Sequence, residues 1–338
     1  MAPRHMREAR RRACEQRERE LRFVVLCVVG AVGAIAIVVA AFFALRSCAS
    51  APEPEPAPVP QTEPAPEPQA PVRAAQLSSA DEALLARAQD VPKLDELLAC
   101  ADLSFDLLPR CIMAMRERGI SAAEAVALVN ADGDYISPDE LSWSGFYGNA
   151  QTIDDTDSIT VLVNKTHRFP DGYEPADLVS LPVGYYGVNP YMRAEAADAV
   201  VSFIDAAMAA GYSEFFAQSS YRSYNEQNDI YSSYAANDGE EAADHYSSRP
   251  GHSDHQTGLA TDFGLGGGPI NDFYTYDGYA WVLEHAHEYG LILRYPEGRE
   301  FITGYEYENW HFRYVGVEAA TIIWEHGWTL EEYRTLFS

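Results

Sequence analysis

The sequence is poor in basic residues, and this limits the partners it can have. Its 338 residues include 24 lysines and arginines but 51 aspartates and glutamates, which gives a net charge of −27. Residues 47–338 hold only 15 of the basic residues and 47 of the acidic ones. A surface of this charge repels nucleic acid and anionic lipid. We therefore expect no nucleic-acid partner, and we interpret the acidity as a means of solubility.

Cysteine is also scarce, with five residues in the chain and no CxxC pair. A structural zinc site of the cysteine type is therefore excluded. Cys100 and Cys111 are the two cysteines of the part expected to fold outside the cell. An oxidising compartment would permit them to pair. Two buried free thiols would give the same pattern, so both interpretations stay open.

One long apolar run stands near the N-terminus. Residues 23–45 contain no charged residue, and a helix of 23 residues spans a hydrocarbon layer of about 30 Å. Eight arginines precede this run and only Arg46 follows closely, which predicts a cytoplasmic tail over residues 1–22 and export of the rest. We expect a single-pass protein of a bacterial cell membrane. A cleaved signal peptide would have a shorter apolar core, of about 7–15 residues, and lipidation at Cys48 would fit poorly with Arg46.

The exported part divides by composition into a linker and two further segments. Residues 46–77 form a Pro/Glu-rich linker with nine prolines within 51–72, which favours an extended spacer. Residues 78–150 show leucines at helical spacing, and Ser121 with Glu124 forms a capping box. The acidic stretch 130–140 lacks the glycine that a calcium loop requires, so we expect no calcium there.

Residues 151–338 mix short strands and helices without a strict alternation. We expect strands over 158–165, 214–223 and 303–316, and helices over 193–210, 277–289, 318–325 and 329–336. This order predicts an α+β domain with a small mixed or antiparallel sheet flanked by helices.

Two segments of this domain carry the residue types of a catalytic zinc site. Ser253–Asp262 (SDHQTGLATD) and Glu308–Gly316 (ENWHFRYVG) together supply two histidines and two carboxylates. Three protein ligands would leave one metal position for water, and a fourth group could act as general base. His255 and Asp262 are too far apart on a helix to share one ion, so Gly258 indicates a turn between them. For Glu308 and His311 we expect a strand with a local bulge.

Five segments in order resemble the VanY-type D-alanyl-D-alanine carboxypeptidases, which are zinc peptidases of the M15 family related to the VanX dipeptidases. They are VNKTHRFPDGYEPADLV, SSYRSYNEQ, RPGHSDHQTGLATDF, YGLILRYPEG and ITGYEYENWHFRYVG. The resemblance covers roughly residues 158–336 and implies the D,D-peptidase/hedgehog-like zinc peptidase fold. It also implies one zinc ion per chain and, as substrate, peptidoglycan stem peptides that end in D-Ala-D-Ala.

The resemblance assigns roles to individual residues. His255 and Asp262 match two zinc ligands in SxHxxGxAxD, and His311 matches the third in ExWH. Glu308 of ExWH matches the catalytic base that activates the zinc-bound water. Arg222 of SxYRSxxxQ matches the arginine that stabilises the oxyanion.

Two more positions match substrate-binding residues, and three depart from the family pattern. Ser253 and Gln227 are the matches. Ser220, Asp254 and Asn309 replace the usual glycine, glutamate and proline. None of the three removes a ligand, and we expect Asn309 to loosen the backbone beside Glu308.

Two other functions fit the same motifs. One is a related zinc endopeptidase that cuts within the stem peptide or a cross-bridge. The other is a zinc-bound domain that binds the cell wall without turnover, although a purely binding site has no need of a base. We also expect Arg294 and Arg313 to be structural ion-pair partners, and His252 to be no ligand.

Overall fold

The structure, a computed structural model, describes residues 77–337 with gaps at 89–90, 134–141 and 266–267. The predicted tail, membrane span and nearly all of the linker lie outside these residues, as does most of the acidic stretch 130–140. Within the described part, no helix is both long enough and apolar enough to cross a membrane. The described residues belong to one compact unit.

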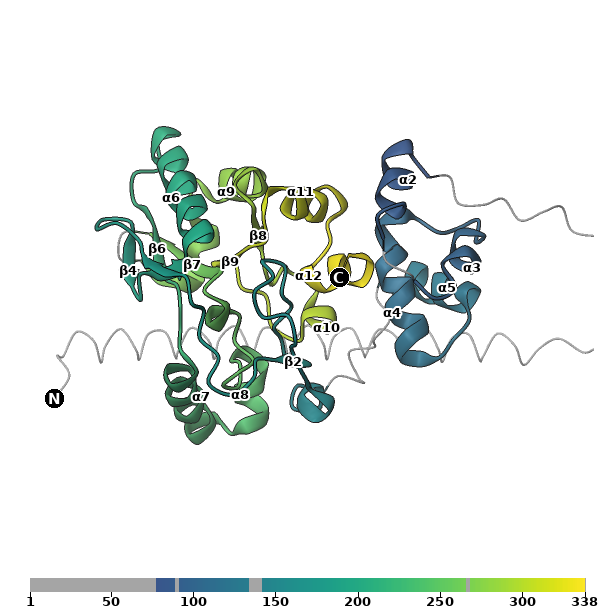
Figure 1. Cartoon of the computed structure of the whole chain (residues 1–338), viewed down its shortest axis with the longest axis horizontal. Coiled ribbons are helices and arrows are strands. Elements are labelled where there is room, and N and C mark those ends of the chain that lie inside the picture. The colour runs from purple at the N-terminus through teal and green to yellow at the C-terminus, as the bar shows by residue number, and fades with distance from the viewer. Residues whose placement is uncertain (1–76, 89–90, 134–141, 266–267, 338) are drawn as a thin grey trace, which may run out of the picture. The chain divides into compact units, whose positions relative to one another are not determined.

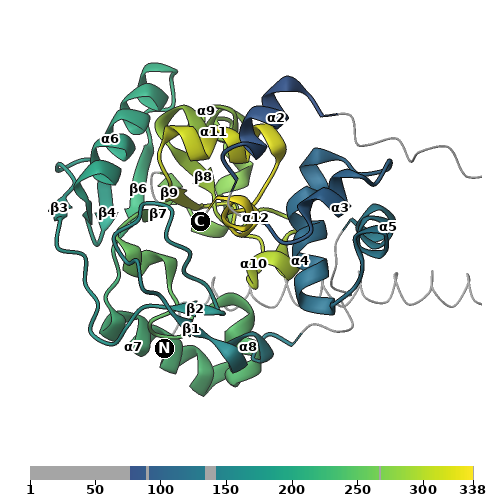
Figure 2. The same cartoon turned by 45° about the vertical axis from the view of Figure 1, so that its right-hand side comes forward.

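A five-stranded mixed sheet forms the centre of the peptidase part (Figures 1 and 2). In spatial order its strands are β4 (Tyr186–Val188), β6 (Phe215–Ser219), β7 (Ala260–Leu265), β9 (His311–Tyr314) and β8 (Leu291–Leu293). β4 runs parallel to β6, and the other neighbours are antiparallel. The predicted α+β class and the mixed sheet are therefore confirmed.

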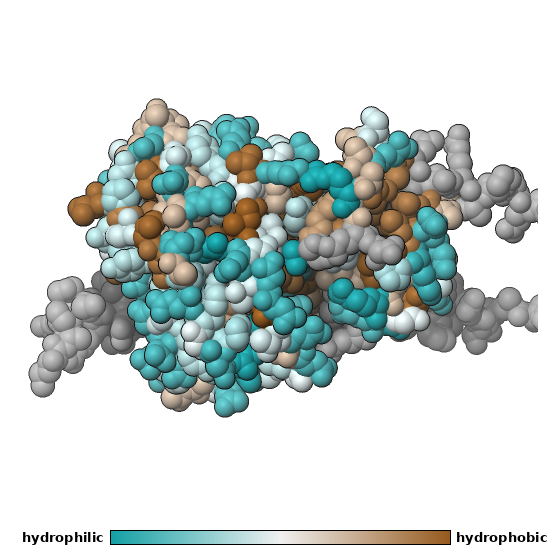
Figure 3. All heavy atoms as spheres, viewed as in Figure 1, coloured by the Kyte–Doolittle hydropathy of each residue, from teal (hydrophilic) through white to brown (hydrophobic). Residues whose placement is uncertain are grey.

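Helices cover both sides of this sheet. α6 (Ala194–Ala209), α9 (Tyr279–His285) and α11 (Val317–His326) lie above it in both views, while α7 (Tyr224–Asp238) and α8 (Glu240–Tyr246) lie below. α6 buries small and aromatic side chains against the sheet, among them Phe203, which contacts Phe215 and Phe263. On the other side, hydrophilic residues cover the outer surface of α7 and α8 (Figure 3).

The N-terminal helices pack on the C-terminal ones. α2 (Ser79–Leu85), α3 (Leu94–Leu98), α4 (Leu108–Arg118) and α5 (Ala122–Asp132) share one hydrophobic cluster with α11 and α12 (Leu330–Leu336). The capping box predicted at Ser121 begins α5. Cys100 and Cys111 are both free thiols.

Shorter elements complete the described part. Two small pairs flank the sheet: β1 (Gln151–Thr152) with β2 (His167–Arg168), and β3 (Leu178–Ser180) with β5 (Tyr191–Arg193). α10 (Glu300–Thr303) precedes β9. The 3-10 helices are η1 (Phe105–Leu107), η3 (Gly145–Asn149), η4 (Asp254–Thr257), η5 (Ile270–Thr275) and η6 (Ala286–Tyr289).

Two strand predictions were wrong, each for its own physical reason. Residues 158–165 form turns, and the carbonyl groups of Ile159 and Val161 accept hydrogen bonds from the Arg313 guanidinium at 3.1 and 2.8 Å. That buried side chain takes the place of a neighbouring strand as hydrogen-bond donor. Only 311–314 of the expected strand 303–316 is a strand, and all four of its residues are buried. No alternating pattern can therefore exist there.

A buried ion pair links the N-terminal helices to α12. Arg110 Nε lies 2.6 Å from Glu332 Oε1, and the two side chains are 5% and 0% exposed. Arg110 also donates to the carbonyl of Gly133 at 2.7 Å. Removing one partner leaves a buried charge without compensation.

We expect Arg110→Met to lower the free energy of unfolding by about 3–5 kcal/mol, because the buried carboxylate of Glu332 would lose its partner. The matched control is Arg116→Met on the same helix, whose pair with Glu117 is solvent-exposed and should contribute less than about 1 kcal/mol. Urea unfolding of both variants measures the difference. Equal effects would contradict the assignment.

Candidate metal centre

A tight turn brings His255 and Asp262 together. His255 lies in η4, Gly258 ends that helix with φ +67°, and Asp262 follows on β7. A Cβ atom on Gly258 would lie 2.9 Å from Leu178 Cδ2 and 3.1 Å from Arg193 Cγ. Only glycine combines this left-handed backbone with such close packing. The turn predicted at Gly258 is confirmed.

Strand pairing adds the second histidine. In the β7–β9 ladder, His311 stands directly opposite Asp262. Glu308 lies in the turn that precedes β9, where its backbone N–H donates to the carbonyl of Tyr295 at 3.1 Å. The bulge expected between Glu308 and His311 is therefore wrong. The irregularity of this sheet lies between β6 and β7, near Ala217 and Ser219.

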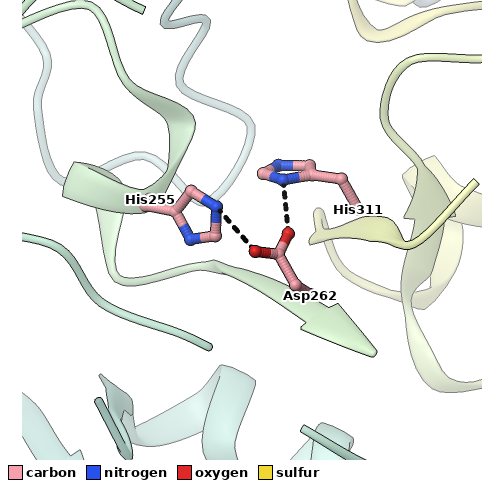
Figure 4. A group of neighbouring side chains, drawn as sticks. All are labelled: His255, Asp262 and His311. Carbon is pink, nitrogen blue, oxygen red and sulfur yellow. Dashed lines mark hydrogen bonds and ion pairs between the residues drawn. The ribbon is translucent and has the colours of Figure 1, made fainter. Parts of the chain in front are cut away.

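Three side chains converge on one point (Figure 4). His255 Nε2 lies 3.4 Å from Asp262 Oδ2, and His311 Nδ1 lies 3.0 Å from Asp262 Oδ1. One donor atom from each residue lies within 4.8 Å of the others, and all three residues are buried. Among the described residues this is the one group of histidines, cysteines and carboxylates found that could hold a metal ion. Two imidazoles and a carboxylate form a donor set that zinc binds in catalytic sites.

Each histidine is held through the nitrogen that points away from the centre. His255 Nδ1 donates to the carbonyl of Ser220 at 2.7 Å. His311 Nε2 lies 3.2 Å from Asp254 Oδ2. Such outer contacts orient the ring and fix which nitrogen carries the proton. The sequence motifs identified Asp254 only as a departure from the family pattern. Its position directly before the ligand His255 is the feature of the sequence that could have indicated a role beside the metal.

The ionisation of the buried groups at this centre is suited to binding a cation. Burial acts to raise the pKa of Asp262, but His255 and His311 lower it well below its ordinary value, so the carboxylate is ionised. Burial lowers the pKa of His255. For His311 burial is overcome by hydrogen bonds to Asp254 and Asp262, which raise the pKa to about 9. Burial raises the pKa of Glu308 to about 7, against the opposing charges of His311 and Arg222.

The predicted arginine and glutamine form a pair beside the centre. Arg222 N–H donates to the carbonyl of His255 at 3.2 Å, and Arg222 Nη1 donates to Gln227 Oε1 at 2.9 Å. Gln227 is buried, and its own amide donates to the carbonyl of Ser248 at 2.6 Å. Gln227 therefore holds the guanidinium in place. Ser253 is buried at the start of η4, and its contact with substrate stays a prediction.

Asn309 and His252 lie near the centre but outside the metal group. Asn309 is held firmly, because its side chain accepts from the N–H of Tyr274 at 3.0 Å and donates to the carbonyl of Asn271 at 3.1 Å. These two bonds oppose the loosening expected beside Glu308, which stays a prediction. His252 is no member of the metal group: its Nδ1 contacts the carbonyl of Asn164 at 2.9 Å.

The segment that contains this centre is similar to known proteins. Residues 189–317 match the family model of VanY, D-alanyl-D-alanine carboxypeptidase, and all seven predicted site residues fall within that range. A protein of Bacillus subtilis (strain 168) that carries a carboxypeptidase name, YodJ, is 44% identical over 191 residues. This match covers 54% of the present chain and 69% of YodJ. The chain belongs to the VanY family.

The chain is also similar to solved structures. The LD-carboxypeptidase LdcB is 42% identical with a TM-score of 0.51, over 55% of this chain and 89% of that one. A mutant of the vancomycin-resistance D,D-pentapeptidase VanY, solved in complex with Zn(II), is 32% identical with a TM-score of 0.45, over 52% and 98%. The VanY family was thus predicted correctly, and so was the class of enzyme, a metallopeptidase with carboxypeptidase relatives.

The raised pKa of His311 predicts how metal affinity depends on pH. Without metal this imidazole is protonated below about pH 9, and a ligand must be neutral, so each bound zinc displaces a proton. From about pH 8.5 to about pH 7.5, above the pKa of Glu308, the dissociation constant should rise about tenfold. Chelator competition on the metal-free protein measures it. A dissociation constant that does not change over this interval would contradict the proposed protonation.

Proposed function

We propose that the protein is a zinc-dependent D-alanyl-D-alanine carboxypeptidase that removes the terminal D-alanine from peptidoglycan stem peptides. The metal would be held by His255, Asp262 and His311. The observation that carries the proposal is the convergence of these three buried donors, with the carboxylate of Glu308 beside them, inside the segment that matches the VanY family.

Glu308 is suited to act as base. Its Oε2 lies 3.6 Å from His311 Nδ1, its side chain is 18% exposed, and it is not in the ligand group. When bound, zinc lowers the pKa of a coordinated water and polarises the scissile carbonyl. Glu308 would accept the proton of the attacking water and deliver it to the leaving amine. With a pKa of about 7, the carboxylate can both take up and release a proton near neutral pH.

Arg222 is suited to stabilise negative charge on the substrate. Its guanidinium is half-buried and is positioned by Gln227. Its charge lowers the pKa of both His255 and Glu308, which indicates that it faces the same small volume. A preorganised cation at the developing oxyanion accelerates acyl transfer more than it strengthens binding of the ground state.

We expect Glu308→Gln to retain zinc and fold but to lose about 10²–10⁴-fold in kcat, because only the base is removed. The matched control is Glu306→Gln in the same loop, whose carboxylate pairs with His245 near the surface and should leave kcat unchanged. The assay is release of D-alanine from a pentapeptide that ends in D-Ala-D-Ala. Loss of zinc together with activity would make Glu308 a ligand and would contradict the proposed mechanism.

A second candidate is an L,D-carboxypeptidase, which removes D-alanine from an L-configured residue. The observation that favours it is the likeness to the LD-carboxypeptidase LdcB, which is 42% identical with a TM-score of 0.51. A tetrapeptide that ends in an L,D-bond tests it beside the pentapeptide. Cleavage of the tetrapeptide alone would establish the second candidate. Release of an internal fragment would indicate an endopeptidase, and binding of wall fragments without any product would indicate a binding domain.

We further propose that residues 23–45 anchor the enzyme in the membrane, with residues 1–22 in the cytoplasm and the peptidase outside. The support is the charge-free run of 23 residues and the arginines that precede it. The Pro/Glu-rich segment 46–77 would then hold the peptidase away from the bilayer, within reach of the wall.

Protease added to intact cells after removal of the wall should release the peptidase by cutting within residues 46–77. We expect cleavage there because proline-rich segments of this composition favour an extended, accessible chain. Immunoblotting of the medium and the cell fraction measures the release, and a cytoplasmic marker protein serves as the control for lysis. A peptidase that stays protected in intact cells but is cut after lysis would reverse the proposed orientation.

A further inference from the structure

The two nitrogens of His311 face different carboxylates. Nδ1 lies 3.0 Å from Asp262 Oδ1, on the side where the metal donors converge. Nε2 lies 3.2 Å from Asp254 Oδ2, on the side away from them. Asp254 is in η4 directly before His255, and it is 1% exposed. One short helix therefore supplies both a metal donor and a contact to the other histidine.

Asp254 is itself fixed by two buried arginines. Its Oδ1 forms an ion pair with Arg313 Nη1, and its Oδ2 lies 3.9 Å from Arg294 Nε. Both guanidinium groups are fully buried. Arg294 in turn pairs with Glu331 of α12, with Nη2 and Nη1 at 2.8 and 2.9 Å from the two carboxylate oxygens. The two arginines are thus balanced in charge by the carboxylates of Asp254 and Glu331. The prediction that Arg294 and Arg313 are structural ion-pair partners is confirmed.

This balance leaves Asp254 little freedom to move. Each carboxylate oxygen faces a cation on one side, and Oδ2 also receives the N–H of His311. The residue therefore offers His311 a rigid, charged acceptor. His255 has a different partner, the neutral backbone carbonyl of Ser220.

We propose that Asp254 is a positioning residue for the metal centre, which keeps the proton of His311 on Nε2 and leaves Nδ1 free to bind the metal. The inference rests on the metal assignment of the proposed function. A neutral imidazole carries its proton on one nitrogen or the other, and the acceptor that it meets decides which. A carboxylate partner also makes the opposite nitrogen a stronger electron donor than a neutral partner does.

The first experiment compares zinc dissociation constants by chelator competition. Asp254→Asn should weaken zinc binding by about 10–100-fold, because loss of a carboxylate behind a ligand histidine has effects of this size. Asp254→Glu restores the carboxylate and should recover most of the affinity. The matched control is Glu331→Gln, which disturbs the same ion-pair network without touching His311. It should lower the thermal stability of the metal-free protein but change zinc affinity by less than about threefold.

These outcomes separate positioning from a purely structural role. If zinc affinity falls in Asp254→Asn and Glu331→Gln alike, in proportion to lost stability, the proposal is overturned. Zinc binding by Asp254→Asn equal to that of the wild type overturns it as well, while the proposed function stands. A wild-type protein that binds no zinc overturns the metal assignment itself, and this inference with it.

A second measurement needs no variant, in case Asp254→Asn does not fold. The wild-type protein is labelled with ¹⁵N-histidine and loaded with ¹¹³Cd²⁺ as a probe for zinc. We expect scalar coupling between the metal and Nδ1 of His311, and a proton on Nε2 that exchanges slowly with solvent. Coupling to Nε2, or a proton on Nδ1, would overturn the proposed role of Asp254.

Discussion

The antiparallel register of β7 and β9 is the constraint on which the metal centre depends. It sets Asp262 opposite His311, two residues that lie 49 positions apart in the chain. Successive side chains of a strand point to opposite faces, so a shift by one residue would turn His311 away from Asp262. A single turn at Gly258 then brings the side chain of His255 close to those of Asp262 and His311. One strand pairing and one glycine therefore assemble the donors.

Buried charge underlies this register. Arg313 on β9 and Arg294 after β8 are fully buried, and their guanidinium groups meet Asp254, Glu331 and the carbonyls of residues 159, 161 and 163. Burial of an ion pair brings little net stability, but loss of one partner is costly. Such a network therefore favours one arrangement over its alternatives more than it stabilises the fold. It joins the loop 158–165, η4 and α12 around the metal centre.

The same electrostatics explain how the centre can support hydrolysis. Asp254, Asp262 and Glu308 surround His311, and without a metal their charges keep that ring protonated. His255, Asp262 and His311 would hold a cation in place of this proton, and its charge would offset the repulsion between Asp262 and Glu308. Glu308 lies at the more exposed edge of the cluster, where the charge of Arg222 also acts on it. The three proposed ligands are thus more buried than Glu308 and Arg222.

The sequence by itself predicted which residues belong to the site, because His255, Asp262, Glu308 and His311 stand in two short motifs that resemble those of the VanY family, and the structure brings His255, Asp262 and His311 together. It also determined α6, α11 and α12, whose amphipathic patterns depend on nearby residues alone. Only the tertiary structure decided which contacts replaced a strand over 158–165 and what holds Asn309. These depend on groups from distant segments, the buried side chain of Arg313 and the backbone of Asn271 and Tyr274, which no local pattern records. The proposed role of Asp254 also depends on the tertiary structure. The sequence shows only that Asp254 precedes His255, and the fold alone brings His311 into contact with it.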